Sequence, residues 1–209
     1  MDKATMERTS RIGGLVVGIL LLAGFTLQSG GFEPEYLDPR GEEFARNNRI
    51  AKPGLWLTGE VVREVVTDWD FVNHLDDPER GNTVMLETRT WYGIPHSVTI
   101  GIVGRGDKLY IHAHSDENRM RTPFPNDKFW TQNVSRDPRV RLKIEDKIYE
   151  ATVALMTDRD EVAGVMGRDP VTVERDPDGQ EHVRSVMHYW RVFQRNVPDY
   201  SADSQGVAF

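Results

Sequence analysis

Apolar and polar residues alternate with a period of two across the middle of the chain. Residues 83–90 read TVMLETRT, which would place Val84 and Leu86 on one face of a strand. Similar runs predict strands over Ser97–Val103 and Lys108–Ala113. Glycine and proline residues between these runs are typical of short turns. The pattern therefore predicts a series of antiparallel hairpins.

The same alternation continues toward the C-terminus. Strands are predicted over Val140–Ile144, Ile148–Leu155 and Val183–Phe193, the first two joined by a tight polar turn. About six short strands with few helices indicate a mainly β fold closed into a small barrel. A β-sandwich is the main alternative.

A few short elements accompany these strands. A short helix is predicted over Lys128–Ser135, and another from Asp158 to about Met166. Glu161 stands three residues after Asp158, which completes the pattern of a capping box. The amphipathic run Leu55–Val66 suits either a strand or a short helix.

The N-terminus carries an apolar run of a different kind. Ile12–Leu27 is free of charged residues, and basic residues precede it while acidic residues follow it. The run is at the short limit for a spanning helix, which needs about 17–20 residues. Residues 27–30 match a signal-peptidase site only weakly, so an uncleaved anchor is favoured over a cleaved signal. The charge bias predicts a single-pass segment in the cytoplasmic (inner) membrane, with the C-terminal domain facing the periplasm or exterior.

Composition then divides the chain of 209 residues. We expect a signal anchor over 1–28, with membrane contact through 12–28, a tether rich in glycine and proline over 29–54, a barrel domain over 55–196 and a flexible tail over 197–209. The net charge of −7 argues against nucleic-acid binding. The absence of cysteine excludes disulfides and thiol chemistry.

Basic side chains and hydroxyl groups occur along the predicted strands and in the long loop after them. An antiparallel barrel that gathers such groups at its strand ends is suited to holding a phosphorylated, planar cofactor. No nucleophile elbow, P-loop or dinucleotide fingerprint is present. The candidate residues are Arg89, Ser97, Thr99, His112, His114, Arg119, Arg121 and Lys128.

The region 83–155 resembles the pyridoxamine 5′-phosphate oxidase-like, FMN-binding split barrels, a family that includes deazaflavin-dependent reductases. The resemblance rests on Gly-Ile-Pro-His-Ser at 93–97, Asp-Lys-Leu-Tyr-Ile-His at 107–112 and the run KFWTQNVSRDPRV at 128–140. It implies a split β-barrel of about six antiparallel strands. It further implies FMN as the cofactor, with F420 or haem as alternatives, and a homodimer.

The resemblance also implies roles for individual residues. Arg89, Ser97 and Thr99 would line the strand part of the cofactor site, while Arg119, Arg121 and Lys128 would come from the loop. Trp130 would cover a ring, although such a tryptophan is more often core. His112 and His114 alternate on their strand, and from this position they would hydrogen-bond a cofactor or pack under a loop. Metal binding is less favoured, because a third metal ligand at suitable spacing is missing. No residue stands out as catalytic; Tyr92, His112 and His114 are candidates by position.

These observations predict a membrane-anchored oxidoreductase that depends on FMN or a deazaflavin and acts on a small molecule. A non-catalytic module that binds haem or another small ligand is the alternative. A third possibility is an interaction domain that keeps the barrel and has lost its cofactor.

Overall fold

The computed structural model describes residues 31–38, 40–43, 51–75, 82–116 and 122–196, and within them the chain is mainly β. Ten strands occur in this part of the chain, with few and short helices. The N-terminal run Ile12–Leu27 lies outside the described residues. In the part that is described, no helix combines the length and the apolar character that crossing a membrane would require.

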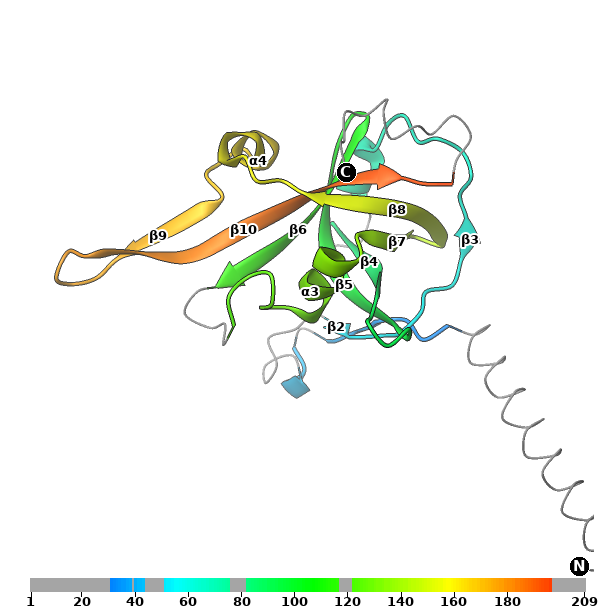
Figure 1. Ribbon diagram of the computed structural model, residues 1–209, viewed down its shortest axis with the longest axis horizontal. Helices are drawn as coiled ribbons and strands as arrows, with labels where there is room; N and C mark the ends of the chain where they lie inside the picture. The colour runs from blue at the N-terminus through cyan, green and yellow to red at the C-terminus, as the bar shows by residue number, and fades with distance from the viewer. Residues whose placement is uncertain (1–30, 39, 44–50, 76–81, 117–121, 197–209) are drawn as a thin grey trace, which may run out of the picture. The chain divides into compact units, whose positions relative to one another are not determined.

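Six of the strands form a closed ring (Figure 1). Each pairs antiparallel with its neighbour, and the pairing of the last strand with β8 closes the circle. The β-sandwich alternative is therefore not what the structure shows, because one continuous sheet curves round on itself. In order around the ring, the strands are β4 (Thr83–Arg89), β5 (Pro95–Arg105), β6 (Lys108–Asp116), β10 (Glu181–Gln194), β8 (Lys147–Leu155) and β7 (Arg139–Ile144).

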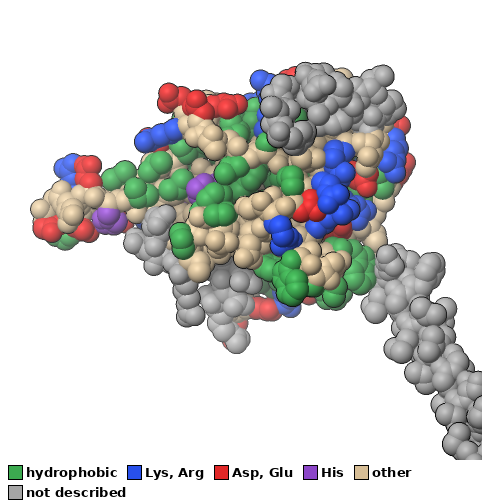
Figure 2. All heavy atoms as spheres, in the orientation of Figure 1, with side chains coloured by type: hydrophobic (Ala, Val, Ile, Leu, Met, Phe, Trp, Pro, Cys, Tyr) green, Lys and Arg blue, Asp and Glu red, His purple; other side chains and the backbone are tan. Residues whose placement is uncertain are grey.

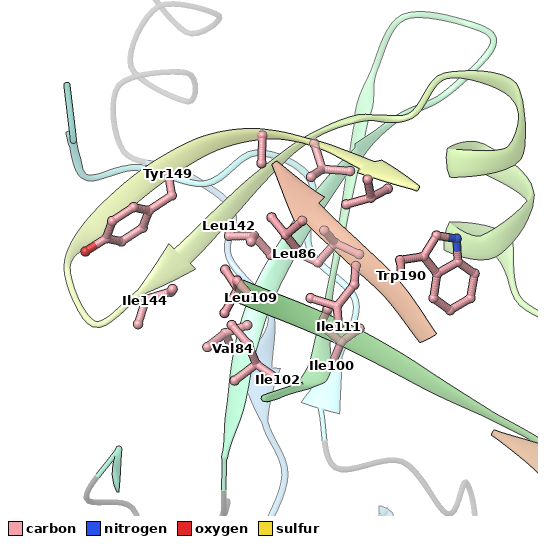
Figure 3. Packing of buried hydrophobic residues seen from close by; sticks show 14 of the residues in the cluster. Val84, Leu86, Ile100, Ile102, Leu109, Ile111, Leu142, Ile144, Tyr149 and Trp190 are labelled. Carbon is pink, nitrogen blue, oxygen red and sulfur yellow. The ribbon is translucent and has the colours of Figure 1, made fainter. Parts of the chain in front are cut away.

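The inner face of the ring is filled by aliphatic and aromatic side chains (Figure 3). Alternate positions of each strand point inward, as Ile100 and Ile102 do on β5 and Leu109 and Ile111 do on β6. This follows from the period of two in the sequence, since successive side chains of a strand leave opposite faces. We call the opposite side of the sheet the outer face.

Two helices pack on different sides of this sheet. On α3 (Phe129–Arg136), Trp130 joins the core and the buried Asn133 amide donates a hydrogen bond of 3.0 Å to Thr88 Oγ1. On α4 (Arg159–Met166), Val162 and Val165 belong to a second cluster on the outer face of β6 and β10. The short 3₁₀ helix η1 (Asp70–His74) packs against β5.

The chain before the ring lies against its outer face. Short strands β1 (Glu35–Tyr36) and β2 (Ala51–Lys52) pair with each other, and Gly54 forms an antiparallel bridge with Ser97 of β5. Further on, β3 (Glu60–Val61) pairs parallel with β8. We call residues 51–62 the strap. Part of the segment interpreted as a tether from sequence thus contacts the sheet.

Most predicted elements are found with small shifts of their ends. The three hairpins are confirmed, and so are both predicted helices and the Asp158 cap, whose carboxylate accepts hydrogen bonds from the amides of Asp160 and Glu161. The run Leu55–Val66 is neither a full strand nor a helix, since only β3 is regular there. An edge strand, β9 (Val171–Arg175), was not predicted. It pairs antiparallel with the first half of β10 (Figure 1).

Candidate functional site on the outer face of the sheet

Four of the predicted site residues share the outer face of β5 and β6. Ser97 and Thr99 lie on β5 at positions that alternate with the inward Val98 and Ile100. His112 lies on β6 directly across from Gly101, and His114 follows two residues later on the same face. Strand pairing therefore brings two hydroxyls and two imidazoles from separate stretches of sequence onto one surface.

The two hydroxyls of β5 have no hydrogen-bond partner among the described residues. Ser97 is fully buried and Thr99 half-buried, and both hydroxyl oxygens are shielded from solvent. The strap passes here, because the amide of Gly54 donates to the Ser97 carbonyl at 2.8 Å and the Ser97 amide donates back at 2.9 Å. A buried hydroxyl without a partner costs about 1–3 kcal/mol. This surface can therefore gain free energy from a polar ligand group that reaches it.

The imidazole of His112 lies over Gly101. A Cβ atom at position 101 would approach the ring to 2.3 Å, so glycine makes room for it. The ring stacks on Tyr189 of β10, with centroids 5.1 Å apart and planes 30° from parallel. Burial lowers the pKa of His112 below the usual 6.5. At neutral pH the ring is thus uncharged and offers one donor and one acceptor.

Lys128 lies at the His114 end of this surface. Its ammonium donates to the His114 backbone carbonyl and pairs with Asp127 at 3.2 Å. The Asp127 carboxylate is fully buried and accepts a hydrogen bond of 2.6 Å from Ser115. Lys128 therefore already has partners in the fold. The predicted loop cations Arg119 and Arg121 lie outside the described residues.

Arg89 lies elsewhere on the outer face. It pairs with Pro95 at the start of β5, while His112 pairs with Gly101 near the middle of that strand. At about 3.3 Å per residue, these two points on β5 are roughly 20 Å apart. Arg89 and His112 are thus not brought together at one end of the sheet.

Trp130 lies on the other side of the sheet from these residues. Its side chain is 5 % exposed and packs in the core, with its ring centroid 4.9 Å from that of Trp190. In this position it contributes to the apolar interior and does not line the outer face.

The structure also shows a group of arginines around Arg89 that the sequence reading missed. Arg139 and Arg141 alternate on β7, and Arg195 follows β10 beside β8. Figure 2 shows Lys and Arg side chains gathered over β7 and β8 with acidic side chains among them. A signal was available in Arg-Val-Arg at 139–141, where the polar positions of a predicted strand are both basic. Among the described residues, no group of three His, Cys, Asp or Glu side chains lies close enough together to hold a metal ion.

No family model and no curated protein matches this chain. Among solved structures, it is similar to a crystal structure described as a "Putative Pyridoxamine 5'-phosphate oxidase" from Listeria innocua, with 16 % identity and a TM-score of 0.34. The match covers 56 % of this chain and 86 % of that one. This likeness is one of fold alone.

Proposed function

We propose that the barrel binds a flavin-type cofactor, FMN or a deazaflavin, on the outer face of β5 and β6 and serves as an oxidoreductase for a small molecule. The observation that carries this proposal is the pair of shielded hydroxyls, Ser97 and Thr99, without partners in the described part of the chain. They share their face with His112, which is neutral and has both a donor and an acceptor to offer. Flavin-type rings carry carbonyl and ring-nitrogen atoms that such groups can recognise.

The role proposed for each residue follows from its position on this face. Thr99 and His112 would orient the ring through hydrogen bonds, and the exposed His114 would border the substrate side. Arg119, Arg121 and Lys128 are the cations assigned to the cofactor phosphate. The cofactor, when bound, supplies hydride transfer, while the protein supplies orientation and electrostatics. The hydroxyl oxygens of Ser97 and Thr99 are both shielded from solvent, so a ligand would reach either one only after the neighbouring chain shifts.

We further propose that residues 12–28 anchor the protein in the cytoplasmic membrane with the barrel outside, and that two copies form a homodimer. The anchor follows from the apolar run in the sequence, and the dimer follows from the family resemblance. Protease accessibility in spheroplasts tests the orientation, and the mass in detergent solution by light scattering tests the dimer.

The cofactor proposal is tested by the visible spectrum of the purified full-length protein and by its uptake of added FMN and F420. We expect an absorption band near about 450 nm for flavin, whereas a band near about 400 nm would favour the haem alternative. A protein that is colourless and binds neither added cofactor would contradict the proposal.

Matched variants connect the spectrum to this surface. Thr99→Val removes the hydroxyl at nearly constant shape, and His112→Phe removes both ring nitrogens. Each should weaken binding of the added cofactor about tenfold, the effect expected from loss of about 1.4 kcal/mol. Thr172→Val on the edge strand β9 is the control and should leave binding unchanged. Equal cofactor affinity in all three variants would show that the cofactor does not bind on this face.

A further inference from the structure

A small cavity opens on the outer face among the arginines near the ends of β4 and β7. It has a volume of about 60 Å³. A water molecule needs roughly 15 Å³ measured in the same way, so the cavity holds a group of about four water-sized atoms. We call it the arginine pocket; it is lined by Glu87, Arg89, Arg139, Val140, Arg141, Glu150 and Arg195.

The pocket has unused hydrogen-bond donors. Within the described residues, the Arg89 guanidinium makes no hydrogen bond or ion pair, since only its backbone carbonyl is engaged, by Arg136. Arg195 uses its Nε to donate to the Ala151 carbonyl at 3.0 Å, and its two terminal nitrogens have no partner in the same part of the chain. Guanidinium groups match oxyanions in geometry because their N–H bonds form a planar fork.

The other lining arginines are already held in place by carboxylates. Arg139 makes a bidentate pair with Asp137, at 2.8 and 2.7 Å. Arg141 contacts Glu87 at 3.0 Å and also donates to the Leu57 carbonyl. These contacts fix two positive groups at the wall, and none of them engages the Arg89 guanidinium or the terminal nitrogens of Arg195.

The local charge is positive although the whole chain carries −7. Six arginines and three carboxylates lie around the pocket. The excess of positive charge affects the pKa of Arg195. Burial lowers the pKa of Arg195, and the positive charges of Arg139 and Arg89 lower it further, while Glu150 and Asp137 oppose the shift. An anion placed between these arginines would relieve their mutual repulsion. The charged groups are Arg63, Arg89, Arg136, Arg139, Arg141, Arg195, Glu87, Asp137 and Glu150.

We propose that the arginine pocket binds the phosphate group of a small phosphate monoester. A carboxylate is satisfied by one guanidinium fork, whereas a tetrahedral dianion can accept from several directions at once. Here Arg89 lies at the end of β4, Arg139 at the start of β7, and Arg195 directly after β10. The volume of the cavity suits a phosphoryl group and leaves the rest of the ligand in solvent.

This pocket borders the Ser97 end of the proposed flavin face, because Glu87 of the pocket pairs with Ser97 of β5. Arg89 lies roughly 20 Å along β5 from His112, too far for the two residues to contact one compact group. The phosphate proposal is therefore tested with small phosphates that carry no flavin ring, so that its failure can be told apart from a failure to bind the cofactor.

The test is calorimetric titration of the full-length protein with inorganic phosphate and with glycerol 3-phosphate. Sodium chloride sets a matched ionic strength, and succinate serves as the dicarboxylate. We expect saturable binding of both phosphates, weaker binding of succinate and no heat beyond dilution from chloride. Phosphate should also raise the melting temperature, as any ligand of the native state does.

Variants locate the binding. Arg89→Gln and Arg195→Gln should each weaken phosphate binding at least about tenfold, since each removes charge-assisted hydrogen bonds. Arg175→Gln is the control, because this exposed arginine on β9 pairs with Glu181 away from the pocket. Unchanged melting temperatures without ligand show that the variants fold. Absence of saturable phosphate binding, binding equal to that of succinate, or equal affinity in all three variants would overturn the proposal.

Discussion

Gly104 on β5 occupies a place where no side chain fits. A Cβ atom there would approach the Trp69 carbonyl oxygen to 2.0 Å. The backbone amide and carbonyl of Gly104 are both hydrogen-bonded to the Asn73 side chain, at 3.0 Å each. Glycine at this position therefore lets the 3₁₀ helix η1 lie directly on the strand.

Replacing this glycine tests the close approach. Gly104→Ala should destabilise the fold by about 1–3 kcal/mol, the range for overpacking a well-filled interior. Urea denaturation gives the free energy of unfolding. Gly164→Ala is the control, because nothing lies within 4 Å of an added Cβ in the middle of α4. That change should stabilise by about 0.5–1 kcal/mol, and a loss of stability equal to that of Gly104→Ala would contradict the packing argument.

His112 predicts how stability responds to acid. Its pKa in the fold lies below the usual 6.5 because burial disfavours the charged ring. The unfolded chain then binds more protons between the two pKa values, so stability is full above about pH 6.5 and falls as the pH drops below it. Burial lowers the pKa of His188 as well, which adds to the same trend.

The prediction is checked by urea unfolding at about pH 7.5 and about pH 5.5. His112→Gln should reduce the loss of stability between these values, by at most about 1.4 kcal/mol per pH unit for one group. His182→Gln, near the start of β10, serves as the comparison. An unchanged pH dependence in His112→Gln would show that this ring titrates freely in the fold.

At the scale of elements, the strap is held by a small ionic clasp. Glu87 Oε2 accepts a hydrogen bond of 2.7 Å from the Leu57 amide and one of 3.0 Å from Arg141. Arg141 in turn donates to the Leu57 carbonyl at 3.1 Å. Both backbone groups of one strap residue are therefore satisfied by side chains of the sheet.

Removing the clasp should free the strap. Glu87→Ala is expected to cost about 1–3 kcal/mol, because it leaves the Leu57 amide and Arg141 without a charged partner. Hydrogen exchange should accelerate across residues 51–62 and stay slow in the ring. Glu181→Ala breaks an exposed pair with Arg175 and should cost less than about 1 kcal/mol. Equal costs in the two variants, or unchanged exchange in the strap, would contradict this role.

The ring strands and both helices were predictable because each carries its own local signal. Alternation in 83–90 and a capping residue at Asp158 act over a few residues, so one sequence suffices to find them. The strap and β9 lack such signals. Two-residue strands such as β3 exist only through pairing with distant partners. The side chains of β9 are mostly exposed, so its sequence shows no apolar face from which a strand could be predicted.

For the whole molecule, β10 is the strand that completes the ring. Its central part pairs with β6, and its last five residues pair with β8. Val192 belongs to both pairings, with Leu109 on one side and Val153 on the other. The closure of the sheet therefore passes through a few residues near the end of the described chain.

Proline substitution distinguishes the ring from its extension. Val192→Pro should cost at least about 3 kcal/mol and open the barrel, because proline removes a ladder hydrogen bond in a strand paired on both sides. Val173→Pro lies on the edge strand β9, where one side faces solvent, and should leave the ring folded. Circular dichroism and urea unfolding measure both. If Val192→Pro still unfolds cooperatively, at the same urea midpoint as the unmodified protein, closure of the ring is not a source of stability.

The candidate site was only partly predictable, since its residues meet through strand pairing. Ser97, Thr99, His112 and His114 could be assigned to one side of their strands from alternation alone. That Arg89 lies far from His112, and close to Arg195, depends on the register around the entire ring. Trp130 could face either way until the orientation of α3 was known.

The late position of β10 has a consequence during synthesis. Translation delivers strands β4 to β8 before the one that joins the two ends of the sheet, so the nascent sheet stays open with both margins unprotected. Hydrophobic surface and bare backbone groups are then accessible to chaperones and to other nascent chains. A chain truncated just before residue 190 should accordingly be held by chaperones, and the chain that includes residue 194 should resist protease.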